Sequence, residues 1–210
     1  MLIQEQSGAN SAQKHRAILA AAEALFLRNG YLGTSMDELA EQSGVSKQTV
    51  YKHFGNKERL FVELVTSMTA GAGKGLYELG GLPQGGTDLI PYFTKYALDE
   101  LVIVMTPRLL QLRRLVIGEV GRFPALAEAL FHNGPERSIR SLAAVISELS
   151  LHGLLTVNDP DVAATTLNWL VLAAPINEAM LRGDASIPSR SALEDHANEA
   201  VRVFIAAYAR

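Results

Sequence analysis

The chain of 210 residues contains no cysteine, so neither disulfides nor thiolate metal sites can contribute to its fold. It also lacks a long apolar run. The longest uncharged apolar stretch, residues 169–176, is far short of the ~20 residues that cross a bilayer. Residues 1–16 are polar and lack the apolar core of a signal peptide. These absences predict a protein of the cytoplasm without a membrane partner.

Strand patterns are missing too, since no convincing run alternates apolar and polar residues. Apolar residues recur instead at helical spacing along nearly the whole chain. Helix start signals recur as well: Thr106, Gly134 and Asp159 each precede a proline, and residues 191–194 read as a capping box. Seven glycines and a proline between residues 71 and 86 predict a loop. The sequence therefore predicts an all-α fold of about nine helices.

The residue constellations of common enzymes are absent. The chain has no Gly-x-Ser-x-Gly nucleophile elbow, no His-x-x-x-His pair and no thiol. Its five histidines are scattered without metal-ligand spacing, and capping or solvated positions explain them better. We therefore expect no enzyme, no cofactor and no bound metal.

The net charge of −3 at first argues against a nucleic-acid partner, but the charge is unevenly spread. Within residues 43–59, four basic side chains face only Glu58; they are Lys47, Lys52, Lys57 and Arg59. A small basic head on an acidic body suits a protein that touches phosphate at one end. A solvated charged face is the alternative that charge alone leaves open.

Residues 35–53 carry the most informative pattern. Ser35 and Glu38 form a capping box that opens a short helix, and Gly44 ends that helix in a turn where only glycine fits easily. Ser46 then caps a second helix, whose Val50 points inward. This spacing predicts a helix-turn-helix, although an ordinary helical hairpin also satisfies the periodicity.

The outward side chains of the second helix are all cationic or able to hydrogen-bond, as a helix in a major groove requires. Residues 33–60 moreover resemble the DNA-binding region of TetR/AcrR regulators. The shared features are a Gly-Val-Ser-Lys turn at residues 44–47, a Tyr-x-x-Phe at 51–54 and a Lys-Glu-x-Leu at 57–60. The resemblance covers about residues 13–65. It implies a flexible arm at 1–12, a three-helix DNA-binding domain at 13–56 and a regulatory domain at 57–210.

The resemblance also implies roles for single residues. Thr34 and Ser35 would bind a phosphate through hydroxyl and backbone N–H groups at a helix N-terminus. Near the start of the recognition helix, polar side chains would read base edges, and those further along would contact phosphates. The predicted DNA-binding residues are Thr34, Ser35, Ser46, Lys47, Gln48, Thr49, Tyr51, Lys52, His53 and Lys57.

Residues 160–182 carry two apolar stripes, and a helix with two such faces must bury both of them. Packing in a four-helix seam between two identical chains would achieve this, as would an internal position in a monomer. The predicted homodimer contacts are Val162, Thr166, Trp169, Ala173, Met180, Ala197, Val201, Phe204 and Tyr208.

The regulatory domain that the resemblance implies would enclose a small hydrophobic or amphipathic effector. Candidate lining residues are Met68, Tyr92, Tyr96, Met105, Arg113, Phe123, Phe131, His132 and Trp169, for whose apolar members core packing is the alternative. Arg113 could anchor an acidic ligand or extend to solvent.

Residues 108–126 also resemble AefR-like regulators. The implied function is a dimeric repressor that an effector releases from a palindromic operator; an activator or a ligand-independent regulator is the alternative.

Overall fold

The computed structural model describes residues 2–69, 82–83 and 89–209, and these form an all-helical fold, as predicted. The glycine-rich loop predicted at 71–86 lies outside the described residues apart from Leu82 and Pro83. Packing divides the chain into two compact units. Unit 1 comprises residues 1–68 and 111–130, and unit 2 comprises residues 69–110 and 131–210.

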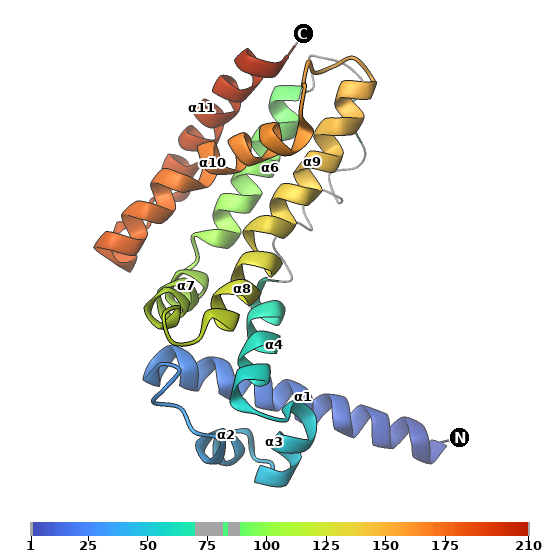
Figure 1. Cartoon of the computed structure of the whole chain (residues 1–210), viewed down its shortest axis with the longest axis vertical. Helices are drawn as coiled ribbons and strands as arrows, with labels where there is room; N and C mark the ends of the chain where they lie inside the picture. Colours follow the sequence, from blue (N-terminus) through green and yellow to red (C-terminus); the bar gives the residue numbers. More distant parts are fainter. Residues whose placement is uncertain (1, 70–81, 84–88, 210) are drawn as a thin grey trace. The chain divides into compact units, whose positions relative to one another are not determined.

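Unit 1 contains the four N-terminal helices and parts of two later ones (Figure 1). These are α1 (Leu2–Asn29), α2 (Met36–Ser43), α3 (Lys47–Phe54) and α4 (Lys57–Thr69), with most of α7 (Pro107–Glu119) and of α8 (Pro124–Asn133). Packing thus joins α4 and residues 111–130 to the first three helices. The functional boundary expected at residue 57 remains a prediction.

The first helix is longer than the sequence suggested. It begins at Leu2, so residues 2–12, which were expected to form an arm, are helical. No proline interrupts this segment, and the first strong stop signal is Gly30, which ends the helix at a φ of 77°. Phe26 on α1 meets Phe61 on α4 edge to face, with ring centroids 5.1 Å apart. Tyr31 stacks on Phe26 and meets Phe61 edge to face. This aromatic cluster fastens α4 to α1.

Unit 2 is built mainly from four long helices and a short 3₁₀ turn. They are α6 (Leu89–Val104), α9 (Pro135–Leu151), α10 (Pro160–Arg182) and α11 (Arg190–Tyr208), with η2 at Asp184–Ser186. α10 packs on α9, and α11 packs on α6. Phe93 and Phe204 meet across the second contact with ring centroids 5.4 Å apart. A single backbone bridge pairs Leu155 with Ala209, and no strand forms in the described ranges.

The helix start signals held at three positions and failed at one. α7, α9 and α10 begin at the prolines that follow Thr106, Gly134 and Asp159. α11, however, is capped by Ser189, whose side chain accepts from the N–H of Ala192 at 3.3 Å. The capping box predicted at residues 191–194 is therefore wrong, because Ser189 directly after Pro188 already has the extended backbone of an N-cap.

Pro175 lies inside α10 and has no N–H to donate to the carbonyl of Val171, one turn earlier. Val171 is buried, so this carbonyl would otherwise lose its partner away from water. His196 of α11 donates to it from Nε2 at 2.8 Å. α10 changes direction part-way along in Figure 1, as an internal proline favours. A side chain of α11 thus supplies the hydrogen bond that Pro175 cannot make within α10.

Replacing His196 with leucine is expected to lower the free energy of unfolding by about 1–2 kcal/mol, because the Val171 carbonyl loses its donor. In a Pro175→Ala background the alanine N–H can serve that carbonyl, so the same change should cost about 1 kcal/mol less. Urea unfolding of the four chains measures this coupling. His152→Leu, at an exposed histidine, is the control; equal losses in both backgrounds would contradict the repair.

Candidate nucleic-acid interface

The corner between α2 and α3 is set by Gly44, whose backbone has φ 69° and ψ 22°. This left-handed conformation strains any residue with a Cβ, and it lets the N–H groups of Gly44 and Val45 close onto the last turn of α2. Leu39 and Val50, one on each helix, are completely buried. The predicted helix-turn-helix is therefore present, and its two helices each turn one apolar face inward.

The N-terminus of α2 is closed by its own side chains. The Ser35 hydroxyl accepts from the N–H of Glu38 at 3.2 Å, and the backbone N–H of Ser35 donates to Glu38 Oε2 at 2.9 Å. The backbone N–H of Ser35, together with the Ser35 hydroxyl 2.9 Å from the same Oε2, lowers the pKa of the Glu38 carboxyl. Thr34 is only 1% exposed, and its hydroxyl donates to the Gly30 carbonyl. The phosphate contacts predicted for Thr34 and Ser35 would therefore require these bonds to break.

The first turns of α3 present a polar face to solvent. Lys47, Gln48 and Lys52 are exposed, and Tyr51 is 43% exposed although it is a large aromatic. The Gln48 side chain makes no hydrogen bond with any described residue. Ser46 caps the helix by accepting from the N–H of Thr49 at 3.2 Å, which fixes where this face begins. These are the features that a recognition helix needs.

Lys47 is held by a contact that it can easily give up. Its ammonium lies 2.7 Å from Asp37 Oδ1 on α2, and both side chains are mostly exposed. The hydrogen bond with this carboxylate raises the pKa of Lys47. Exposed ion pairs contribute little to stability, so a phosphate or a guanine edge can replace Asp37 at small cost.

Two of the predicted contacts turn toward the protein. His53 is half-buried, and its ring centroid lies 5.8 Å from that of His15 on α1. His15 in turn stacks on Phe54 and hydrogen-bonds Glu63. Thr49 is also partly buried, with its hydroxyl 2.9 Å from that of Ser46. Both side chains therefore contact neighbouring residues of the chain, and only part of each is accessible to a ligand.

Lys57, which was predicted to bind DNA, is hydrogen-bonded to the backbone of its own chain. Its ammonium donates to the carbonyls of Tyr31 and Thr34, at 2.9 and 3.0 Å, and lies 4.6 Å from the centre of the Tyr31 ring. Partial burial lowers its pKa. Lys57 thus ties the start of α4 to the turn that precedes α2. Two of its three donors are occupied, so its main effect on DNA would be to position Ser35 and α2.

Residues 18–64 match the family of bacterial regulatory proteins called the tetR family, and residues 92–210 match the AefR-like transcriptional repressor C-terminal domain. Together the two matches cover both the helix-turn-helix and most of the remaining chain. The chain belongs to the TetR family of transcriptional regulators. The resemblance seen in the sequence is thereby confirmed.

Similar structures extend over nearly the whole TetR-family chain. A TetR-family transcriptional regulator from Mesorhizobium loti is 37% identical, with a TM-score of 0.84, over 95% of this chain and 98% of that one. The flavonoid-responsive regulator FrrA is 29% identical, with a TM-score of 0.78, over 94% and 98%. Among curated relatives, LmrA of Bacillus subtilis is 44% identical over 52 residues, which are only 28% of its length. These relatives are transcriptional regulators, not enzymes.

The residues predicted at a dimer seam separate into two groups. On α10, Val162 (57%) and Trp169 (39%) are exposed, and so are Thr166 and Ala173. On α11, Ala197, Val201 and Phe204 are buried in the core of unit 2 and expose no surface on which a partner could pack. Met180 and Tyr208 are partly buried against that core. Periodicity locates an apolar stripe but not what it packs against.

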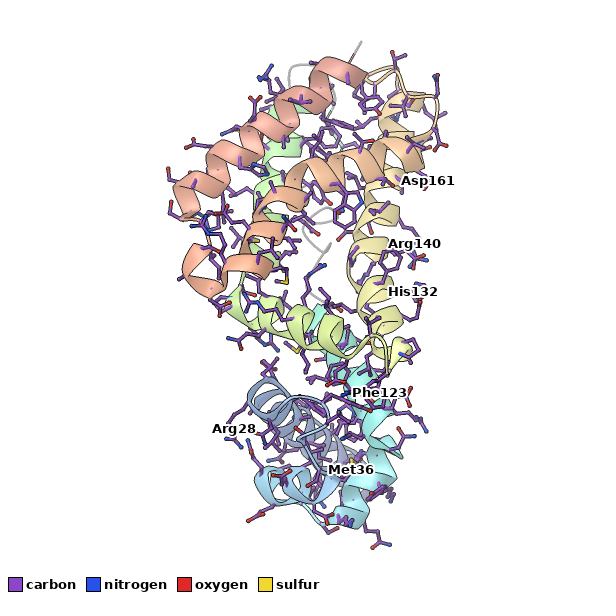
Figure 2. The ribbon with its side chains drawn as sticks, turned by 60° about the vertical axis from the view of Figure 1, so that its left-hand side comes forward. Arg28, Met36, Phe123, His132, Arg140 and Asp161 are labelled. Atoms are coloured by element: carbon purple, nitrogen blue, oxygen red, sulfur yellow. The ribbon has the colours of Figure 1, made fainter. Side chains whose placement is uncertain are left out.

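The predicted effector residues do not form one enclosed lining within either unit. Met68, Arg113 and Phe123 belong to unit 1, where Phe123 packs on Tyr31 with ring centroids 4.6 Å apart. Burial lowers the pKa of the Arg113 guanidinium. In unit 2, Tyr96 and Met105 are buried and Tyr92 is partly buried, whereas Phe131, His132 and Trp169 are exposed. His132, labelled in Figure 2, lies on α8 and pairs with Glu136 at the start of α9.

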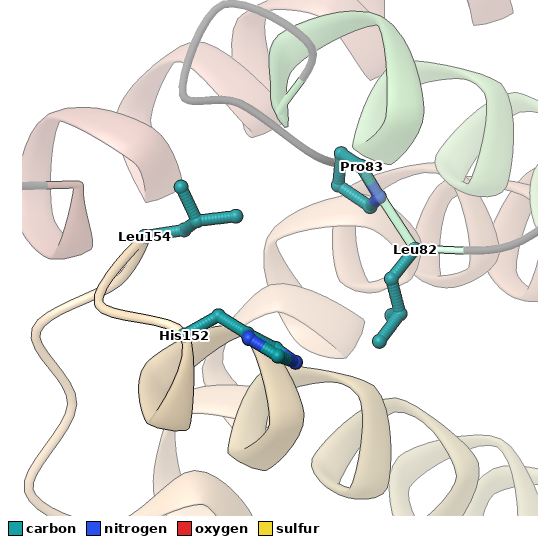
Figure 3. A pocket seen from close by; sticks show the side chains of 4 residues that line it. All are labelled: Leu82, Pro83, His152 and Leu154. Atoms are coloured by element: carbon teal, nitrogen blue, oxygen red, sulfur yellow. The ribbon is translucent and has the colours of Figure 1, made fainter.

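A hollow of about 330 Å³ in unit 2 is lined by Leu82, Pro83, His152 and Leu154 (Figure 3). None of these residues was predicted as a ligand contact. Within the described ranges no group of three His, Asp or Glu side chains could hold a metal ion. No described helix combines the length and apolar content needed to span a membrane.

Sequence reasoning missed three buried polar residues of unit 2, namely Glu100, Ser138 and Asn168. One signal was available. Phe93, Tyr96 and Glu100 are spaced as one face of a helix, so the carboxyl group continues a stripe that points into the core. Nothing in the sequence marks Ser138 or Asn168, because polar residues on helices usually face water.

Replacing Lys57 with methionine should lower the free energy of unfolding by about 1–2 kcal/mol, since two carbonyls lose their donor. Lys52→Met removes the same charge from an exposed position on α3 and should change stability by less than about 0.5 kcal/mol. Urea unfolding distinguishes the two. Equal effects would show that Lys57 does not brace the turn before α2.

Proposed function

We propose that this chain is a repressor that binds a palindromic operator as a homodimer and is released by a small effector. The observation that carries the proposal is the exposed polar face of α3, which is mounted on a capped and buried helix-turn-helix. Such a helix can enter a major groove, and a dimer would place two of them about one DNA turn (~34 Å), or a multiple of it, apart. Operator binding implies that the protein works in the cytoplasm.

On α3, Lys47 and Gln48 are the proposed readers of base edges, because they are exposed and lie at the end of the helix that enters the groove first. Lysine suits the acceptors of guanine, and glutamine suits adenine. Tyr51 and Lys52, further along, are proposed phosphate contacts. Such contacts orient the domain without selecting a sequence.

The DNA-binding half does not determine whether such a regulator represses or activates transcription. FasR of Mycolicibacterium smegmatis, an activator, and AcnR of Corynebacterium efficiens, a repressor, both match the chain over short segments, at 36% and 34% identity. The C-terminal match is to a repressor domain, which favours repression. An effector is favoured by relatives such as FrrA, which is named as flavonoid-responsive.

The proposed dimer contact is the exposed face of α10 with the neighbouring part of α11. Val162, Trp169 and Leu181 are exposed on α10, and Val203 is exposed on α11. Burying these side chains would remove apolar surface from water, which is the usual driving force of association. Since α10 and α11 pack together within unit 2, one twofold contact could use both helices.

Gln48→Ala should relax the base preference at one operator position, by about 1–3 kcal/mol of discrimination. Tyr51→Ala should instead weaken binding to all sequences alike, because it removes a phosphate contact. Shift assays with fragments of the upstream region of the gene, each carrying single base changes, measure both effects. An unchanged preference profile for Gln48→Ala would show that other residues read the operator.

Trp169→Glu should shift the chain from dimer to monomer, because it places a charge in the proposed contact. Operator affinity should fall with it, since each half-site then binds one helix-turn-helix alone. Leu151→Glu, at an exposed leucine on α9, is the matched control. Light scattering after size-exclusion chromatography gives the mass; a Trp169→Glu dimer would move the contact away from α10.

A further inference from the structure

Three polar side chains meet inside the apolar core of unit 2. Tyr96 and Glu100 lie one turn apart on the same face of α6, and Ser138 faces them from α9. Glu100 is 5% exposed and Ser138 is 1% exposed. The Ser138 hydroxyl donates to Glu100 Oε1 at 2.8 Å. Most of their neighbours are apolar, among them Phe93, Leu101 and Leu142.

This group has more hydrogen-bonding capacity than the described chain uses. The Tyr96 hydroxyl is buried without a partner. Among the described residues, the hydrogen bond that Ser138 donates to the Glu100 carboxyl reaches Oε1 and leaves Oε2 available. On α10, the Asn168 amide is also buried with neither its nitrogen nor its oxygen paired. Native cores pair nearly all such groups, so several unpaired ones in one core indicate a missing partner.

The electrostatics favour a partner that donates hydrogen bonds to the carboxyl group. Burial raises the pKa of the Glu100 carboxyl, and the Ser138 hydroxyl only partly offsets this. Burial and the neighbouring Glu100 raise the pKa of Tyr96 well above its usual value. An amine or hydroxyl placed beside Glu100 would supply the donor that the carboxylate lacks, whereas a second carboxylate would repel it.

We propose that Tyr96, Glu100 and Ser138 are the polar end of the effector site, and that this site takes a small, largely apolar compound bearing an amine or hydroxyl. This inference rests on the proposed function, because it takes the bound compound to be the effector that releases the repressor from DNA. The apolar side chains around the three residues would hold the rest of such a molecule. Carboxylate ligands, the class that Arg113 would anchor, are expected to bind this site more weakly.

The test uses the full-length protein and three probes that share one ring system: 2-naphthol, 2-naphthylmethylamine and 2-naphthoate. Titration calorimetry should show the alcohol and the amine binding about tenfold or more tightly than the carboxylate. Glu100→Gln should weaken the amine by about tenfold and reduce the discrimination against the carboxylate. Asp99→Asn, whose carboxylate pairs with Lys95 outside the group, should leave all three affinities unchanged.

Tyr96→Phe separates a ligand contact from a packing role. Because the hydroxyl has no partner in the described chain, removing it should leave the midpoint of thermal unfolding unchanged or raised. A contact to the ligand predicts in addition that affinity for the alcohol falls several-fold. Loss of stability without loss of affinity would assign Tyr96 to the core alone.

The proposal is overturned if no probe binds, if the carboxylate binds as tightly as the others, or if Glu100→Gln keeps the discrimination. Operator shift assays without any probe test the proposed function separately. If the protein binds the probes in the expected order but does not bind its operator, the proposed function is contradicted and the ligand site is supported. Operator binding without probe binding would do the reverse.

Discussion

Gly44 imposes the constraint on which the DNA-facing surface depends. Leu39 and Val50 can both be buried only if the chain turns sharply between α2 and α3, and the left-handed backbone of Gly44 makes that turn. Once both helices have an inward face, the side chains at the remaining positions of α3 must point outward. The polar surface is thus the geometric consequence of burying the apolar one. Lys57 then braces the preceding turn from α4.

Some buried polar groups of unit 2 are paired by neighbouring side chains, and others are left without a partner in the described chain. Where Pro175 deprives the Val171 carbonyl of its donor, His196 supplies another, and the core is closed. Around Tyr96 and Glu100 the described chain supplies one hydroxyl and leaves other groups unpaired. The first arrangement serves stability alone. The second costs stability unless a ligand pairs with these groups, as we propose for the effector.

Much of the fold followed from the sequence because its signals are local. The capping box at Ser35, the glycine turn at Gly44 and the cap at Ser46 each act within one helical turn, and each was found as expected. The start of α11 was misplaced by two residues because two serines could both serve as its cap. The outward face of α3 was also predicted correctly, apart from Thr49 and His53, which are partly buried.

What the sequence determined by itself is therefore the set of helices, the corner at Gly44 and the polar character of α3, since these depend on neighbours a few residues away. Only the tertiary structure decided that Lys57 grips two backbone carbonyls and that the stripe of Val201 and Phe204 faces the core of its own chain. It alone brought Ser138 to Glu100 across 38 positions. Such contacts depend on which helix packs on which, and helical periodicity is the same whatever partner covers the stripe.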